Sequence, residues 1–255
     1  GKPVYYSPYN GKIQDGYMYT DNGFWDTFRA VHPLFTLLYP EVSERVTQSI
    51  LNAYDESGFM PEWASPGHRE CMIGNNSISL LTDAWMKGIR TICPEKALEA
   101  MIHQTEARHT GISSVGRDGF GYYDRLGYVP YPEVHEATAK TLEYAYADWC
   151  VARFADSIGR KEIADTYYRK ALNYRNLYYP DYGFMWAKDA NGKWRDAFDA
   201  TEWGGPFTEG SSWHWTWSVL HDPEGLSRLM GGHTAMEARL DSMFTAPNTY
   251  NYGTY

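Results

Sequence analysis

Residues 136–159, EATAKTLEYAYADWCVARFADSIG, carry the clearest secondary-structure signal in the chain. Apolar side chains recur there at the i, i+3, i+4, i+7, i+8 spacing of one helix face, at Leu142, Ala145, Tyr146, Trp149 and Cys150. A second helical pattern follows Gly159 and ends before Tyr179-Pro180, because proline disfavours a helical residue ahead of it. The two segments predict a hairpin of helices joined by a very short connection.

Helical spacing extends over most of the remaining sequence. Proline and glycine bound further predicted helices at residues 24–39, 41–57, 76–87, 94–108, 211–220, 223–230 and 234–244. No convincing alternation of apolar and polar residues predicts a long strand, although Asn191-Gly192 is typical of the turn of a small hairpin within residues 182–194. The sequence therefore predicts an all-α chain of paired helices, roughly nine in number.

Composition excludes several classes of partner. The chain has 255 residues with 32 Asp and Glu against 23 Lys and Arg, a formal net charge of -9, which argues against binding a phosphate backbone. No segment approaches the roughly 20 apolar residues of a membrane-spanning helix, and the first residues show no secretion-signal pattern. Three cysteines, Cys71, Cys93 and Cys150, are too dispersed to indicate a zinc site or a disulfide framework, and at most one bridge is possible. Nucleic acid and a membrane span are therefore not expected.

Aromatic side chains make up 16% of the residues and gather in the segments between helices. Four such segments are rich in Gly, Pro, Trp and Tyr: residues 1–23, 59–75, 109–132 and 196–210. Long loops on a helical scaffold commonly carry binding residues, and rings that also bear an N–H or O–H suit a polar ligand. We therefore expect the functional residues in or next to these loops.

The first candidate cluster is Phe24-Trp25-Asp26-Thr27-Phe28-Arg29. Asp26 and Arg29 are three residues apart, so they could simply pair on the surface of a helix, where Asp26 would also favour the positive helix end. Alternatively, Trp25 supplies a flat apolar face and Asp26 accepts hydrogen bonds from hydroxyl groups, which is what binding a sugar ring requires. Both interpretations remain open from the residues alone.

The second cluster joins Glu62-Trp63 to Gly74-Asn75-Asn76-Ser77. A carboxylate next to an indole is again a combination that binds polyols. Asn75 lies in a run whose first interpretation is a helix N-cap, because Asn and Ser accept the unsatisfied N–H groups of a first helical turn. Substrate contact by Asn75 is the alternative.

The third cluster runs from Trp203 to Trp217 and contains Glu209, Trp213 and His214. Glu209 precedes a predicted helix, so it could interact only with the helix dipole. Four tryptophans nearby favour a different role, in which aromatic burial raises the pKa of the carboxyl so that it keeps a proton for a leaving oxygen. No G-x-G-x-x-G, P-loop, HExxH or G-x-S-x-G motif is present.

Several motifs, in order along the chain, resemble glycoside hydrolase family 92, whose members are calcium-dependent, inverting exo-α-mannosidases found widely in gut Bacteroides. The motifs are YSPYNG at 6–11, DNGFWDTFR at 21–29, GFMPEW at 58–63, CMIGN at 71–75, TLEYA at 141–145 and FTEG at 207–210, with Trp213. The resemblance implies an (α/α)6 toroid preceded by a β-sandwich domain. It implies Glu209 as general acid and Trp25 and Asp26 at the terminal mannose.

The resemblance also implies a calcium ion on two sugar hydroxyls, a mannose-containing glycan such as an N-glycan or mannan as substrate, and export to a bacterial periplasm or surface. Ser211 and Ser212 depart from the family, which has Asn after the Glu-Gly pair. The family places its calcium-binding segment, its general-base carboxylates and its last helices beyond the point corresponding to Tyr255. We therefore expect a partial toroid over residues 1–255, with metal ligands and base elsewhere in the parent protein.

Three other functions are compatible with the residues. Aromatic and carboxylate clusters also serve (α/α)6 glycosidases of other sugar specificity. A sugar-binding fragment could keep Trp25, Asp26 and Trp63 without catalysis. A purely structural fragment would have neither activity nor affinity.

Overall fold

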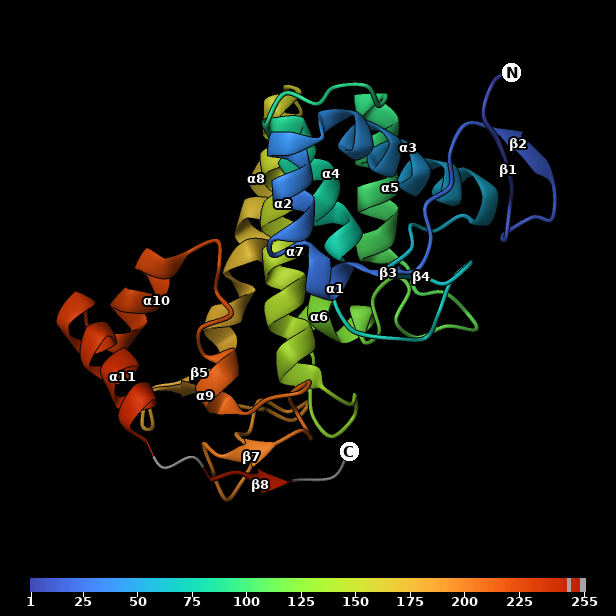
Figure 1. Ribbon diagram of the computed structural model, residues 1–255. Coiled ribbons are helices and arrows are strands. Elements are labelled where there is room, and N and C mark those ends of the chain that lie inside the picture. The colour runs from blue at the N-terminus through green and yellow to red at the C-terminus, as the bar shows by residue number, and fades with distance from the viewer. Residues whose placement is uncertain (247–248, 253–255) are drawn as a thin grey trace. The chain divides into compact units, whose positions relative to one another are not determined.

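The structure is a computed structural model that describes residues 1–246 and 249–252, and it consists mainly of helices joined by long loops and very short strands (Figure 1). Contacts divide the chain into two compact units. Unit 1 comprises Gly1–Phe120 and Ala147–Tyr168, and unit 2 comprises Gly121–Tyr146 and Arg169–Tyr255. Helix α7 (Ala137–Ser157) contributes residues to both. The mainly helical fold that the sequence predicts is confirmed.

Unit 1 is built from helices and two antiparallel strand pairs, β1–β2 and β3–β4. The strands are β1 (Val4–Tyr6), β2 (Ile13–Asp15), β3 (Asn22–Gly23) and β4 (Trp63–Ala64). The helices are α1 (Phe24–Thr27), α2 (Val31–Leu38), α3 (Pro40–Ser57), α4 (Asn76–Met86), α5 (Pro94–Glu106) and α8 (Lys161–Lys170), together with the later part of α7.

Helix α4 forms the centre of unit 1. It packs on α7, where the rings of Trp85 and Phe154 have centroids 5.2 Å apart and the Trp85 indole N–H donates to Ser157 Oγ at 2.9 Å. Thr82 Oγ1 donates to the carbonyl of Cys150 at 3.2 Å, so a polar group inside the core is satisfied. This packing holds the C-terminal half of α4 against α7, while buried polar residues gather around its start.

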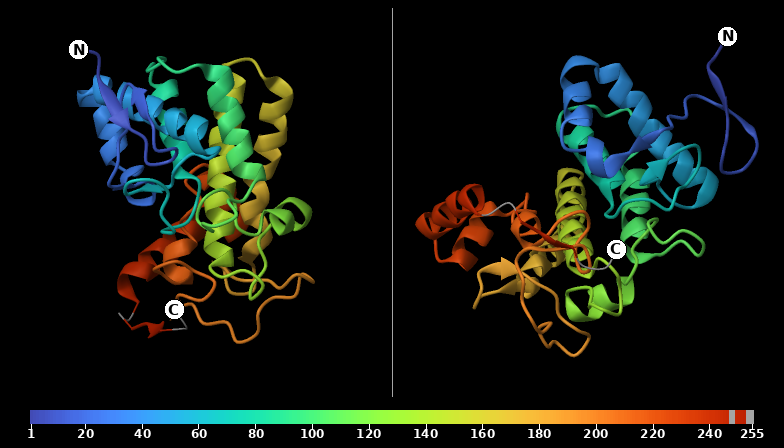
Figure 2. Two further views of the ribbon diagram at one scale, coloured as in Figure 1. Left: turned by 90° about the vertical axis from the view of Figure 1, so that its right-hand side faces the viewer. Right: turned by 60° about the horizontal axis from the view of Figure 1, so that its bottom comes forward.

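The helical hairpin expected from residues 136–178 is present. α7 ends at Ser157, Gly159 has φ 78, and α8 begins at Lys161, so the chain reverses within a few residues (Figure 2). Such a left-handed conformation favours glycine. Beyond Lys170 the chain tightens into the 3₁₀ helix η1 (Ala171–Leu177) rather than continuing as α-helix.

One predicted helix, over residues 24–39, is wrong: the structure has α1 and α2 separated by a turn. Pro33 explains the interruption. Its ring lacks an N–H and would clash with the carbonyl of Arg29 if the helix were continuous, so the chain breaks before residue 31. The break leaves Trp25 and Asp26 on a short helix of their own.

Unit 2 combines short helices with two small sheets, the antiparallel pair β5–β6 and the parallel pair β7–β8. Its strands are β5 (Tyr178–Tyr179), β6 (Phe184–Met185), β7 (Glu202–Trp203) and β8 (Asn251–Tyr252). Its helices, besides η1 and the first part of α7, are α6 (Phe120–Leu126), α9 (Ser212–Trp215), α10 (Pro223–Met230) and α11 (His233–Thr245).

Three sequence predictions in unit 2 need correction. Helix α6 lies in a segment predicted as loop, because buried Tyr123 packs edge-on against Tyr144, with centroids 5.6 Å apart, and this packing outweighs the low helix propensity of glycine beside it. The helix predicted over 211–220 is only α9, since later N–H groups bond three residues back. The hairpin around Asn191-Gly192 is reduced to one antiparallel bridge between Lys188 and Trp194.

Two further expectations concern disulfide bonds and membrane-spanning helices. Cys71, Cys93 and Cys150 are all free thiols, so no disulfide joins them. Within residues 1–246 and 249–252, no helix combines the length and the apolar character that crossing a bilayer requires.

Candidate active site

In unit 1 the pairing of β3 with β4 sets the position of the Trp25-Asp26 turn. The N–H of Phe24 donates to the carbonyl of Glu62 at 3.0 Å, and Gly23 lies opposite Trp63 in the strand register. A Cβ added to Gly23 would lie 2.3 Å from the Trp63 ring, so the indole packs directly on a backbone that only glycine allows. Trp63 is thereby fixed next to the start of α1.

Trp25, Asp26 and Arg29 are all accessible to some degree. Trp25 is half-buried, while Asp26 and Arg29 are exposed. The Arg29 guanidinium lies 5.2 Å from the centroid of the Trp25 ring and 4.7 Å from that of Phe28, which are cation–π distances. No ion pair joins Asp26 to Arg29 in the part of the chain that the structure describes, so the expected surface pair does not form. Arg29 instead holds the indole, and the Asp26 carboxylate is free to accept hydrogen bonds from a ligand.

Glu62 does not share a solvent-facing surface with Trp63, which corrects the predicted polyol-binding pair. Its side chain is 2% exposed and accepts from Ser77 N at 3.1 Å, Ser77 Oγ at 2.8 Å and Gln104 Nε2 at 3.0 Å. Glu62 immediately precedes β4 and is buried, whereas Trp63, the first residue of β4, is half-buried. The carboxyl group therefore ties the start of α4 to α5.

Burial dominates the electrostatics of Glu62. Removal from water raises the pKa of this carboxyl to about 8, and the hydrogen bonds from Ser77 and Gln104 act in the opposite direction. The group is therefore largely protonated at neutral pH, which suits a structural network better than a hydrogen-bond acceptor for a sugar.

Asn75 is likewise buried, at 1% exposure; it occupies the N-cap position of α4, as predicted, but its side chain makes no capping hydrogen bond. Its Nδ2 donates to the carbonyl of Gly116 at 3.0 Å, and its Oδ1 accepts from Arg117 Nε at 2.8 Å. Arg117 in turn forms a fully buried ion pair with Asp148 at 2.8 Å. The structure thus assigns Asn75 to a polar network inside unit 1 rather than to a surface that a sugar could reach.

Glu209 occupies an unusual turn in unit 2. Its neighbours Thr208 and Gly210 are buried, the Thr208 carbonyl accepts from Trp215 Nε1 at 2.8 Å, and the Gly210 carbonyl accepts from Gly204 N at 3.0 Å. Glu209 itself has φ 43, a conformation that costs a non-glycine residue about 1–3 kcal/mol and that often occurs at functional sites. The side chain is exposed, so the aromatic enclosure predicted around it is not found. The turn holds the residue by its neighbours and leaves its carboxyl accessible.

Trp213 and His214 follow directly on α9. Trp213 is half-buried with its ring edge-on to Phe184 at 4.7 Å. His214 forms a capping box with Ser211, in which the Ser211 N–H donates to His214 Nδ1 at 3.2 Å. Desolvation of the ring, although His214 is exposed overall, lowers its pKa and so favours the neutral imidazole. Glu209, Trp213 and His214 therefore belong to one locally ordered segment, whereas Trp25, Asp26, Arg29 and Trp63 belong to unit 1.

The residues present do not fit a calcium site. Calcium takes about six to eight oxygen ligands and usually several carboxylates. Among residues 1–246 and 249–252, no three His, Cys, Asp or Glu side chains come together in a way that could hold a metal ion.

Sequence reasoning missed Gln104, Arg117 and Asp148 of the buried networks, and it named Ser77 only as part of a capping run. Gln104 could have been found, because it falls three residues after Met101 on the apolar face of α5. A polar residue on a core-facing stripe needs a buried partner. Arg117 carried no comparable signal, since it lies in an irregular loop.

Known proteins support the motif-based expectation. The profile of the Glycosyl hydrolase family 92 catalytic domain matches residues 1–255. A family GH92 inverting mannosidase from Bacteroides thetaiotaomicron has 84% sequence identity and a TM-score of 0.95, with 100% of this chain and 35% of that chain covered. A family GH92 alpha-mannosidase from the same species has 33% identity and a TM-score of 0.86, covering 95% of this chain and 32% of that one.

A more distant relative comes from the fungus Arthroderma benhamiae. It is described as an uncharacterized secreted glycosidase and is 26% identical, with 75% of this chain and 29% of the relative covered. The chain therefore spans about a third of the length of the proteins that it matches. Since the family profile covers every residue, the chain belongs to glycosyl hydrolase family 92, within its catalytic domain.

Proposed function

We propose that the protein containing this chain is an exo-acting α-mannosidase that removes terminal α-linked mannose from a glycan with inversion at the anomeric carbon. The observation that carries the proposal is the 84% identity, over the whole chain, to a family GH92 inverting mannosidase. Because the chain covers 35% of that enzyme, the activity is proposed for the protein as a whole.

Glu209 is the proposed general acid. Its exposed carboxyl group stands on a turn whose flanking residues are fixed by backbone and indole hydrogen bonds, as a proton donor that must be held in one place requires. The protonated carboxyl gives its proton to the glycosidic oxygen as the bond from that oxygen to the anomeric carbon breaks. Water then attacks the opposite face, aided by a second carboxylate about 6.5–9.5 Å from the acid. We assign no residue to that base.

Trp25 and Asp26 are the proposed contacts of the terminal mannose. The half-buried indole offers a flat apolar face to the C–H side of a pyranose, and the exposed carboxylate accepts from hydroxyl groups. Arg29 keeps the indole in place through its cation–π contact, and Trp63, packed on Gly23, borders the same turn. Glu62 and Asn75 act from inside unit 1, where they fix the start of α4.

Two further proposals rest on the family resemblance. The whole protein is expected to depend on calcium. The described residues contain no group of three His, Cys, Asp or Glu side chains that could hold the ion, so such a group among them is not the expected ligand set. It is expected to be secreted, periplasmic or on the surface of a bacterium; the relative from Arthroderma benhamiae, described as a secreted glycosidase, supports export.

The direct test is mannose release from an α-linked mannobiose by the longest form of the protein that its gene encodes, followed by NMR. The proposal predicts β-mannose as the first product, because a single displacement inverts the anomeric carbon. Glu209→Gln is expected to lower kcat by roughly 10²–10⁴-fold. Glu237→Gln changes an exposed glutamate on α11 and serves as the matched control that keeps full activity. α-Mannose as the first product, or full activity in Glu209→Gln, would overturn the proposal.

A further inference from the structure

Unit 2 contains a cavity of about 280 Å³ beside α9. Its lining residues include Trp213 and His214 of α9, Met243 near the end of α11, and Tyr250 just before β8. This volume is near the lower end of the roughly 300–1,000 Å³ typical of ligand pockets, so the cavity suits a ligand the size of one sugar ring.

Ring contacts and backbone bonds build the polar side of this cavity. The ring of Trp203 lies edge-on to both His214 and Tyr250, with centroids 5.2 Å away in each case, and His214 and Tyr250 are 5.7 Å apart. The Asn251 N–H donates to the carbonyl of Thr201 at 3.1 Å, which starts the parallel pairing of β8 with β7. The pairing of β8 with β7 therefore holds Tyr250, the residue before β8, next to α9.

His214 presents a defined donor to the cavity. Because its Nδ1 accepts from the Ser211 N–H, the proton of the neutral ring is on Nε2. Within the described residues, His214 Nε2, the Trp213 indole N–H and the Tyr250 hydroxyl make no hydrogen bond to the protein. Three side chains that line one cavity thus keep polar atoms available for a ligand.

The cavity is uncharged. None of the described residues that line it is Asp, Glu, Lys or Arg. The lowered pKa of His214 keeps its ring neutral near pH 7. Aromatic walls with neutral donors and a hydroxyl match a ligand that has C–H faces and hydroxyl groups, and they offer no counter-charge to a phosphate or a carboxylate.

We propose that this cavity is a binding subsite for one neutral sugar ring, with Trp213 as its stacking face and His214 Nε2–H and the Tyr250 hydroxyl as its hydrogen-bonding groups. Glu209 is near it along the chain: a Cβ added to Gly210, the next residue, would lie 3.2 Å from His214 Cβ. The choice of mannose as the sugar rests on the proposed function, whereas the neutral, ring-shaped chemistry rests on the cavity itself.

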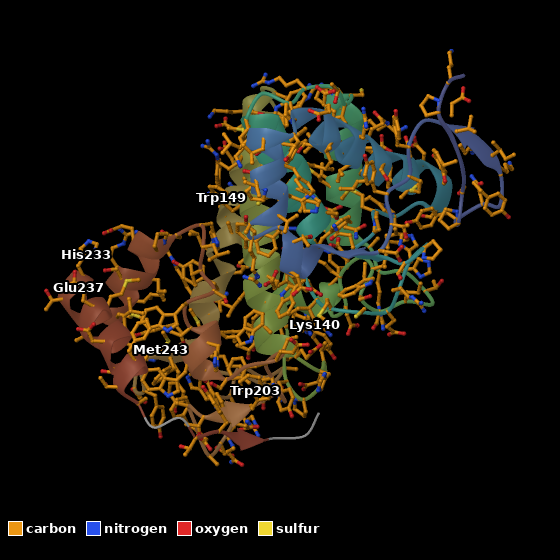
Figure 3. All side chains as sticks on the ribbon, viewed as in Figure 1. Lys140, Trp149, Trp203, His233, Glu237 and Met243 are labelled. Atoms are coloured by element: carbon orange, nitrogen blue, oxygen red, sulfur yellow. The ribbon has the colours of Figure 1, made fainter. Side chains whose placement is uncertain are left out.

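The test is an NMR titration of the longest form of the protein that its gene encodes, with labelled histidine and tryptophan side chains, by methyl α-mannoside. The His214 imidazole and Trp213 indole signals are expected to shift saturably, while His233, at the opposite end of α11 from Met243, stays unchanged (Figure 3). Inorganic phosphate at the same concentration is expected to leave the His214 signals in place.

Two conservative variants separate binding from folding. His214→Gln keeps a side chain that can complete the capping box with Ser211 but removes the imidazole N–H. Tyr250→Phe removes only a hydroxyl group. Each is expected to weaken methyl α-mannoside binding by roughly five- to tenfold, as the loss of one hydrogen bond predicts. Tyr182→Phe, at an exposed tyrosine of unit 2 outside the cavity, is the matched control and should bind like the parent chain.

The inference is overturned if methyl α-mannoside leaves the His214 and Trp213 signals unmoved up to its solubility limit, or if phosphate shifts them equally. Unaltered affinity in both His214→Gln and Tyr250→Phe would contradict it as well. Because the readout is binding, a protein that binds here but releases no mannose would refute the proposed function alone. A protein that releases mannose but does not bind here would refute only the subsite.

Discussion

Carboxylates of the same type have very different surroundings in this chain. Glu62 is enclosed and receives hydrogen bonds from Ser77 and Gln104, so its charge is suppressed and its role is to join helices. Glu209 is exposed, and its backbone has a positive φ. This conformation costs energy and is more typical of functional sites than of ordinary surface positions. Because both glutamates lie near tryptophans in the sequence, both were predicted to act at a sugar-binding site, Glu62 in binding and Glu209 as proton donor. Their different burial distinguishes them.

The raised pKa of Glu62 predicts a pH dependence of stability. Between its ordinary value of 4.5 and about 8, the folded state holds a proton that the unfolded state has released, so the free energy of unfolding falls as pH rises through this range. Glu62→Gln, which cannot titrate, should flatten that slope. Urea unfolding at several pH values measures it, and an unchanged slope in the variant would show that Glu62 is not the titrating group.

The buried pair of Arg117 and Asp148 predicts a large effect from a single change. Arg117→Met leaves the Asp148 carboxylate buried without its cation, and breaking such a pair costs about 3–5 kcal/mol of unfolding free energy. Arg117→Lys keeps the positive charge and should lose less. Chemical denaturation of both variants decides the matter, and a loss below 1 kcal/mol for Arg117→Met, a threshold set well under the range above, would mean that the pair contributes little.

At the scale of the element, helices with long amphipathic patterns and clear end signals were predictable. Helix α3 begins at Pro40 and ends at Ser57, where Gly58 with φ 84 caps it, and both Pro40 and Gly58 are readable as boundary residues. Helix α7 is present where the sequence predicts a helix, but it is buried on nearly all sides rather than along one apolar stripe, and Tyr146 and Trp149 of the predicted stripe are only half-buried. Pro33 separates α1 from α2 in the structure. The sequence contains this signal, but the apolar spacing around Pro33 favoured the prediction of one continuous helix. Helix α6 and the two-residue strands depend on contacts with distant residues, which local patterns do not contain.

The candidate site was predictable to a similar extent. Motifs placed Trp25, Asp26 and Glu209 in loops or at helix starts, where the structure has them at least partly exposed. The inward direction of Glu62, just before the two-residue strand β4, goes with its hydrogen bonds to Ser77 and Gln104, which no local pattern contains. The cavity beside α9 depends on the pairing of β8 with β7, whose two strands are distant in sequence.

Helix α10 offers a test of element stability. Asp222 caps it by accepting from Gly225 N at 2.8 Å and also receives Tyr174 Oη at 2.7 Å and Arg175 Nη2 at 2.9 Å. Asp222→Ala should therefore lower the free energy of unfolding by about 1–2 kcal/mol. Asp241→Ala, on the exposed surface of α11, is the control, expected to change stability by no more than about 0.5 kcal/mol. Equal effects of the two changes would contradict the capping role.

At the scale of the molecule, the candidate residues are divided between the two units, and they lie within a chain that covers about a third of related enzymes. In the proposed function, Trp25 and Asp26 of unit 1 contact the terminal sugar, and Glu209 of unit 2 donates the proton. Substitution of Trp25 or Asp26 should therefore raise KM for any α-mannoside. Loss of Glu209 should instead lower kcat, and the decrease should be larger for leaving groups that need protonation to depart.

The most direct measurement compares Glu209→Gln with the parent protein on two α-mannosides, one with a dinitrophenol leaving group and one with a second sugar. A dinitrophenolate departs without protonation, so the variant should hydrolyse that substrate nearly as fast as the parent, while its rate on the disaccharide falls by roughly 10²–10⁴-fold. An equal loss on both substrates would show that Glu209 does not act as the general acid.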